Sequence, residues 1–115
     1  MSLLGKSLSE GSADFIGELI AGDNDNPHLH EYGNPREKQL WLEFKKEMNG
    51  SDADNWLYQG DKAKDKPADL GYYIGYKIVE SYYNKAKDKK QAIKDILEIK
   101  DFNVFLTASG YDEKF

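Results

Sequence analysis

The sequence contains no cysteine. This absence excludes disulfide scaffolds, thiol catalysis and every zinc site that needs sulfur ligands. No stretch approaches the roughly 18 apolar residues that a membrane-spanning helix requires. The opening segment Met1–Gly5 also lacks the long apolar core of a secretory signal. We therefore expect a soluble chain without a membrane span, and the composition leaves its compartment open.

Basic residues are scarce in the first half of the chain. Residues 1–60 carry 5 basic and 11 acidic side chains, residues 61–115 carry 11 and 10, and the net charge is -5. A general nucleic-acid binder needs a basic face to neutralise phosphates. This charge distribution excludes that class of function.

Length and composition predict one folded domain over residues 1–115. A chain of 115 residues has the size of a single domain. Hydrophobic residues make up 39% and aromatic residues 13%, which is enough to build a core and too much for a disordered chain.

Apolar residues recur at spacings of three and four, and the alternation typical of strands is absent. We therefore expect an all-α domain of about five helices. The expected helices and boundaries are Ser9–Ala21, the segment between Asn34 and Gly50, Pro67–Lys85, the segment after Asp88, and the segment between Asp101 and Gly110.

Helix ends are predicted from capping residues. Ser7 or Ser9 is the expected N-cap of the first helix, and Gly22 is its stop. Asn34 is expected to cap a helix with Pro35 at its first position. The turn-forming residues that follow Gly22, in the string GDNDNP at residues 22–27, predict a surface loop as far as Gly33. The apolar faces expected on the first, second, fourth and fifth helices comprise Leu8, Phe15, Ile16, Leu19, Ile20; Leu40, Trp41, Phe44, Met48; Ala92, Ile93, Ile96, Leu97; and Phe102, Phe105, Leu106.

The helix Pro67–Lys85 is expected to lie at the centre of the domain. Its apolar arc covers roughly 240° of the helical wheel, which leaves a polar side of Tyr73, Lys77, Glu80 and Ser81. Gly71 and Gly75 fall inside the arc, where each costs about 1 kcal/mol relative to alanine. We expect another helix or a substrate backbone to approach closely there. The polar segment 50–66 is expected to be an ordered loop, anchored to the core by Trp56, Leu57 and Tyr58.

An acidic stripe occupies one side of the first helix. Glu10, Asp14 and Glu18 follow at intervals of four residues, about 6 Å apart along the axis. A solvated face is the simpler interpretation. Like charges at this spacing repel one another, and no basic residue on the stripe relieves them, so a bound cation is the alternative.

The two histidines lie close together, at His28 and His30. Such a pair is usually exposed, and we do not expect it to bind a metal alone. The string from His30 to Asn34 begins like the zinc-protease motif HExxH but has asparagine in place of the second histidine. Residues 23–26 lack the glycine and closing glutamate of a calcium loop.

Five of the eight tyrosines fall between Tyr72 and Tyr83. Tyr72, Tyr76 and Tyr83 form a stripe, and the simpler interpretation is the rim of the core. The alternative is that one phenol faces a cleft and donates a hydrogen bond to a developing oxyanion.

Three segments together resemble a known family: residues 8–16 (LSEGSADFI), residues 34–41 (NPREKQLW) and residues 67–79 (PADLGYYIGYKIV). They look like the C-terminal part of the bacterial predicted zinc-dependent proteases related to gliding-motility lipoproteins. In that family an HExxH helix comes shortly before the segment that matches Glu10. A Glu-x-x-x-Asp pair follows it, as in gluzincin metallopeptidases, and here this pair is Glu10 and Asp14.

The resemblance implies roles for these residues. Glu10 would be the third protein ligand of a catalytic zinc, beside two histidines. Asp14 would accept the free N–H of a ligand histidine and fix its tautomer. The zinc would activate a water, with the glutamate of HExxH as general base for attack on a peptide or protein substrate. Tyr72 or Tyr76 is the expected oxyanion donor.

The sequence departs from the family pattern because it contains no HExxH. We therefore expect no activity and no zinc in this chain alone. One hypothesis is a fragment of a metallopeptidase that continues upstream, from a cytoplasmic or a cell-envelope lipoprotein parent. Exposed apolar surface on such a fragment predicts a homodimer. The alternative hypothesis is a non-enzymatic helical module whose tyrosine-rich groove holds a peptide or a partner helix, and a structural domain without a site also stays open.

Overall fold

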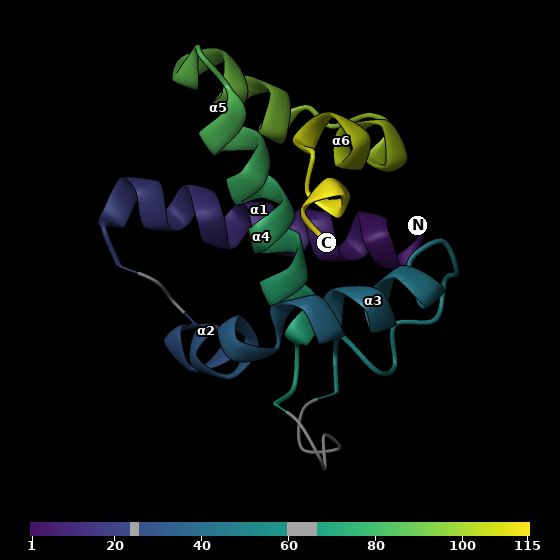
Figure 1. Cartoon of the computed structure of the whole chain (residues 1–115). Coiled ribbons are helices and arrows are strands. Elements are labelled where there is room, and N and C mark those ends of the chain that lie inside the picture. Colours follow the sequence, from purple (N-terminus) through teal and green to yellow (C-terminus); the bar gives the residue numbers. More distant parts are fainter. Residues whose placement is uncertain (24–25, 60–66) are drawn as a thin grey trace.

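The computed structural model describes residues 1–23, 26–59 and 67–115. Within these ranges the chain is helical and forms no strand, which confirms the predicted all-α class (Figure 1). No helix in the described ranges is long and apolar enough to span a membrane. The α-helices and short 3-10 turns (η) are α1 (Leu3–Ala21), α2 (Pro27–Gly33), η1 (Asn34–Arg36), α3 (Glu37–Glu47), α4 (Leu70–Lys85), α5 (Lys89–Leu97), α6 (Phe102–Ser109) and η3 (Asp112–Lys114).

Helix α4 lies at the centre, as predicted, and α1 crosses it (Figure 1). Helices α5 and α6 lie towards one end of α4, and α2 and α3 lie towards the other. The α1–α4 crossing therefore places the residues of α1 against the tyrosine-rich helix.

Glycines permit the close crossing. A Cβ atom added to Gly75 would overlap the Ser7 carbonyl, and one added to Gly11 would overlap the backbone of α4. A Cβ atom at Gly71 would lie 2.7 Å from Leu57 Cδ2 and 2.8 Å from Ser7 Oγ. The prediction that another helix approaches Gly75 closely is confirmed, and Gly71 is packed by side chains from both α1 and the preceding loop.

Helix α1 begins earlier than predicted. Ser2 is its N-cap and accepts a hydrogen bond from the Gly5 amide at 3.0 Å, so the prediction of Ser7 or Ser9 is wrong. The earlier start buries Leu3 and Leu4 completely, and this packing favours the extra turns. Gly22 ends the helix in the left-handed conformation at φ 82°, as predicted.

The predicted apolar face of α1 is only partly buried. Leu8 and Phe15 lie in the core, whereas Leu19 is 43% and Ile20 is 83% exposed, contrary to the prediction. The last turn of α1 extends past α4 (Figure 1), so the described neighbours leave much of both side chains exposed.

The loop predicted between Gly22 and Gly33 is wrong over Pro27–Gly33, which forms α2. Residues 24–25 of this predicted loop lie outside the described residues. Pro27 occupies the first turn, where its missing N–H costs nothing. Leu29 and Gly33, four residues apart, are both buried. Contact with the rest of the protein therefore stabilises a short helix that local composition disfavours.

Asn34 does not cap the following helix. Its backbone is itself helical at φ -57°, and the chain passes from α2 through η1 into α3. The Asn34 side chain instead accepts a hydrogen bond from the Tyr73 hydroxyl at 2.9 Å. The helix predicted between Asn34 and Gly50 is otherwise confirmed, with Leu40, Trp41 and Phe44 buried.

In the segment after Gly50, Trp56 and Leu57 are 1% exposed and anchor the loop as predicted. The Trp56 indole N–H donates to Glu47 Oε2 at 2.8 Å. Tyr58 is 65% exposed, so its prediction as an anchor is wrong. The part of this predicted loop at residues 60–66 lies outside the described residues.

Helix α4 begins at Leu70 and not at Pro67, because Asp69 adopts the left-handed conformation at φ 64°. Two residues assigned to its polar side, Tyr73 and Ser81, are buried at 0% and 6% exposure. Ser81 Oγ donates to the Ser109 carbonyl at 2.8 Å, so α6 covers that side of α4.

The caps of the last two helices are confirmed. Asp88 Oδ1 accepts from the Gln91 amide and Asp101 Oδ1 from the Val104 amide, both at 3.1 Å. Gly110 ends α6 at φ 68°. Ile96 is buried as predicted, but Leu97 is 67% exposed because it lies at the edge of an open groove.

Candidate functional site

The acidic stripe of α1 lies against the tyrosine stripe of α4. The Tyr76 hydroxyl donates a hydrogen bond to Glu18 Oε2, and the Tyr72 phenol interacts in the same sense with Glu10. Glu10, Asp14 and Glu18 are all partly buried. The stripe is therefore not a fully solvated face, because the α1–α4 crossing gives Glu10 and Glu18 tyrosine partners.

Tyr72 lies beside the carboxylate that the family resemblance singles out. The pKa of Tyr72 is raised to about 12, chiefly by burial. The hydrogen bond to Glu10 and the negative charges of Glu10, Asp69 and Asp14 act in the same direction. The phenol therefore stays protonated at neutral pH and remains a hydrogen-bond donor. Tyr72 is also partly exposed, which leaves it accessible from solvent.

Tyr76 is more enclosed, at 7% exposure. Burial first, and then its hydrogen bond to Glu18, raise the pKa of the Tyr76 phenol. Its ring packs edge-on against Phe15, with centroids 5.4 Å apart. Of the two tyrosines predicted as oxyanion donors, Tyr76 is committed to the α1–α4 contact, and Tyr72 is the one beside Glu10.

Asp14, one turn after Glu10, receives a hydrogen bond from outside its own helix. Asn26 Nδ2 donates to Asp14 Oδ2 at 2.6 Å. Asn26 directly precedes α2 and makes no side-chain cap to it. Sequence reasoning missed this contact because the two residues meet only when α2 docks beside α1.

The two histidines have different surroundings. His28 is exposed. His30 is half-buried and packs edge-on against Tyr76 and Tyr73, with ring centroids 4.4 and 5.2 Å apart. Sequence reasoning treated His30 as a loop residue and missed this packing, although its position one residue after the buried Leu29 is the available signal.

No group of three or more His, Asp or Glu side chains within the described ranges is placed to hold a metal ion. A protein zinc site needs three or four ligands. Neither His28 nor His30 belongs to such a group with Glu10. The described residues alone do not fit a bound zinc.

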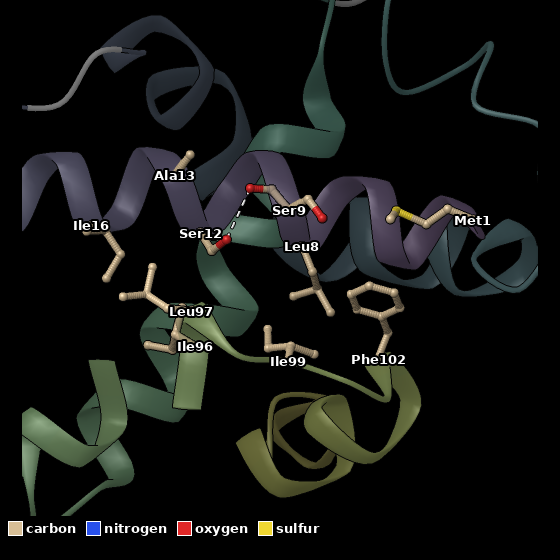
Figure 2. A pocket seen from close by; sticks show the side chains of 10 residues that line it. All are labelled: Met1, Leu8, Ser9, Ser12, Ala13, Ile16, Ile96, Leu97, Ile99 and Phe102. Atoms are coloured by element: carbon tan, nitrogen blue, oxygen red, sulfur yellow. Dashed lines mark hydrogen bonds between the residues drawn. The ribbon is translucent and has the colours of Figure 1, made fainter. Parts of the chain in front are cut away.

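A separate groove lies between α1, α5 and α6 (Figure 2). Its volume is about 480 Å³. The lining contains no charged side chain and consists of Met1, Leu8, Ser9, Ser12, Ala13, Ile16, Ile96, Leu97, Ile99 and Phe102. The Ser12 hydroxyl donates to the Ser9 carbonyl at 3.1 Å, as Figure 2 shows. The groove therefore suits an apolar occupant, and the sequence did not predict it because Ile16 and Leu97 were assigned to the core.

A family model described as "Predicted Zn-dependent protease (DUF2268)" matches residues 1–103. The comparisons with curated proteins and with solved structures find no match to this chain. The matched segment includes every residue of the two stripes and all of the helices α1 to α5.

Proposed function

Since the chain belongs to the family of predicted Zn-dependent proteases (DUF2268), we propose that it forms the helical part of a zinc peptidase that provides Glu10 as a metal ligand. Asp14 orients a ligand histidine in this proposal. The histidines and the general base of HExxH come from a segment outside these 115 residues. The substrate is a peptide or protein.

The juxtaposition of Glu10, Asp14 and Tyr72 supports this proposal. Glu10 and Asp14 are one helical turn apart on α1, and both carboxylates are partly buried rather than fully solvated. Tyr72 donates towards Glu10, and Asn26 donates to Asp14. In metal sites, residues that do not bind the metal themselves often orient the ligands through such hydrogen bonds, and their loss lowers the affinity for the metal.

Tyr72 is the proposed hydrogen-bond donor to substrate, and its single hydroxyl proton, directed at Glu10 in this structure, would turn to the substrate oxygen when Glu10 binds the metal. A phenol with a pKa of about 12 keeps its proton at neutral pH and can stabilise negative charge on a carbonyl oxygen. Tyr76 is the second residue proposed from the sequence, and its bond to Glu18 supports a role in placing α1 against α4. Replacing Tyr72 is therefore expected to affect turnover more than replacing Tyr76.

Zinc content, measured by elemental analysis, tests the proposal. We compare this chain with a longer polypeptide that includes upstream coding sequence carrying an HExxH. The expected result is one zinc in the longer polypeptide and none in this chain. Asp14→Asn in the longer polypeptide should weaken zinc binding by about 10- to 100-fold.

The matched pair Glu10→Gln and Glu18→Gln separates a ligand from a neighbour on the same stripe. Glu10→Gln should remove the zinc and the proteolytic activity, whereas Glu18→Gln should retain the zinc. Retention of zinc in Glu10→Gln contradicts the ligand assignment. Absence of any upstream HExxH contradicts the peptidase proposal as a whole.

A non-enzymatic binding module is the alternative, and the uncharged groove beside α1 favours it. Apolar grooves of this kind accept the apolar face of a peptide helix. This alternative predicts that Leu97→Arg abolishes peptide binding without affecting the residues around Glu10, because Leu97 lies on α5, lines the groove and is 67% exposed. Its groove lies at α5 and α6 rather than at the tyrosines named from the sequence.

A further inference from the structure

Helix α2 depends on its neighbours for stability. It has seven residues, and isolated helices shorter than about 12 residues are marginal in water. Leu29 is 2% exposed, and a Cβ atom at Gly33 would lie 2.7 Å from the Tyr73 ring. Docking against α4 therefore decides whether α2 is folded.

His30 occupies the centre of this contact. Its ring meets the edges of Tyr73 and Tyr76, at centroid distances of 5.2 and 4.4 Å. Because Tyr76 is itself hydrogen-bonded to Glu18, His30 also contacts the acidic stripe of α1 through Tyr76. The imidazole thus packs α2 against α4, and Tyr76 links this contact to Glu18 of α1.

Charged groups of both signs face His30 from the neighbouring helices. Helix α4 contributes Lys77 and Glu80, which form an ion pair at 2.8 Å, and α1 contributes Glu18. Burial first, and then the positive charge of Lys77, lower the pKa of His30 below 6.5, while Glu18 and Glu80 act in the opposite direction. Of the other charged or titratable groups on α2 and η1, Tyr32 is partly buried, and the exposed ones are His28, Glu31 and Arg36.

We propose that α2 is a pH-sensitive latch, docked on α1 and α4 while His30 is neutral and released when His30 is protonated. Protonation places a cation in a half-buried site beside Lys77. When α2 is released, water hydrates the imidazole, and the charged form is no longer disfavoured by burial. Acidification therefore shifts α2 from the docked to the released form.

Release of α2 also changes the acidic stripe. Asn26 directly precedes α2, and its side chain holds Asp14 Oδ2 at 2.6 Å. When α2 leaves, Asn26 leaves Asp14. The latch itself is independent of zinc chemistry, but if the proposed function holds, acidification removes a hydrogen bond that orients Asp14.

Hydrogen exchange of this chain tests the latch between about pH 5 and pH 7.5, where histidine titrates. The reporters are the amides of Leu29 and Asn34, which donate to the carbonyls of Asn26 and His30. After correction for intrinsic exchange rates, their opening constant should be flat above pH 6.5, the ordinary pKa of histidine. It should rise as the pH falls from 6.5 to the pKa of docked His30, by at most about tenfold per pH unit.

Two substitutions on α2 form a matched pair. His30→Gln should make the opening constant independent of pH, and His28→Gln should leave the pH dependence intact. If His30→Gln releases α2 at every pH, that variant cannot report on the pH dependence. NMR titration of the His30 imidazole in the unsubstituted chain then tests whether its pKa is below 6.5. A His30 pKa at or above 6.5, opening that does not change with pH, or a pH dependence that survives His30→Gln would overturn the proposal.

Discussion

Gly75 of α4 lies directly against the Ser7 carbonyl of α1, with no room for a side chain between the two backbones. This contact sets how closely the central helices cross. It therefore also sets the distance between the acidic residues of α1 and the tyrosines of α4.

Substitution of Gly75 with alanine should separate α1 and α4. The new methyl group would overlap backbone atoms, which cannot rotate away as a side chain can. We expect Gly75→Ala to lower the free energy of unfolding by about 3 kcal/mol, measured by urea denaturation. Gly17→Ala is the control, because nothing lies within 4 Å of a Cβ atom there. Gly17→Ala should stabilise the helix by about 0.5–1 kcal/mol, and equal losses at both positions would contradict the crossing.

Ser7 is fully buried, and its hydroxyl has no hydrogen-bond partner among the described residues. Ser7→Ala should therefore raise the free energy of unfolding by about 1 kcal/mol, since it removes an unsatisfied polar group. Ser109 is the matched control, because its buried hydroxyl donates to the Leu106 carbonyl at 2.6 Å and accepts from the Tyr111 amide at 3.1 Å. Ser109→Ala should lower the free energy of unfolding by about 1–2 kcal/mol. A loss of stability in Ser7→Ala would indicate that the Ser7 hydroxyl has a partner after all.

Tyr76→Phe should keep the aromatic contacts with Phe15 and His30 but remove the hydrogen bond to Glu18. We expect the free energy of unfolding to fall by about 1 kcal/mol. Thermal denaturation measures this loss. Tyr58→Phe is the control, because Tyr58 is 65% exposed. An unchanged melting temperature in Tyr76→Phe would show that the α1–α4 contact does not depend on this bond.

Asp112 makes stability depend on pH in the acid range. Its carboxylate accepts from Lys45 Nζ at 2.9 Å and from the Trp41 indole N–H at 2.8 Å, and these two contacts lower the pKa of Asp112 below 3.8. The folded state therefore binds the proton less readily than the unfolded state. The contribution of Asp112 should be complete above pH 3.8 and be lost as the pH falls through the folded pKa.

Denaturant melts of the unsubstituted chain and of Asp112→Asn measure this contribution. The difference in stability between the two proteins should be constant above the ordinary aspartate pKa and shrink below it. A difference that does not change with pH would mean that the Asp112 charge plays no part.

Predictions from sequence succeeded where the deciding contacts are local. Asp88 and Asp101 cap their helices through amides three residues away, and Gly22 and Gly110 end helices by their own backbone conformation. These contacts close within one turn, so the sequence around each residue is sufficient to predict them. The glycines of α4 also predicted the close approach of another helix, because glycine inside a helix is less stable than alanine and needs a packing reason.

Predictions failed where distant parts of the chain determine burial. Tyr73 was assigned to a polar side, yet Gly33, Asn34 and His30 enclose it. Tyr111, near the end of the chain, is 0% exposed, and its hydroxyl donates to Glu37 at 2.8 Å. These partners lie tens of residues away in sequence, and helical periodicity carries no information about them.

The sequence by itself determined that this chain is all-α, that α4 is central, and that Glu10, Asp14 and Glu18 share one side of α1. These properties follow from helical spacing and from caps within a few residues. The tertiary structure alone decided that α2 is helical, that His30 packs it against α4, and that the acidic stripe faces tyrosines. The physical reason is that a short helix and a partly buried carboxylate both depend on what packs against them.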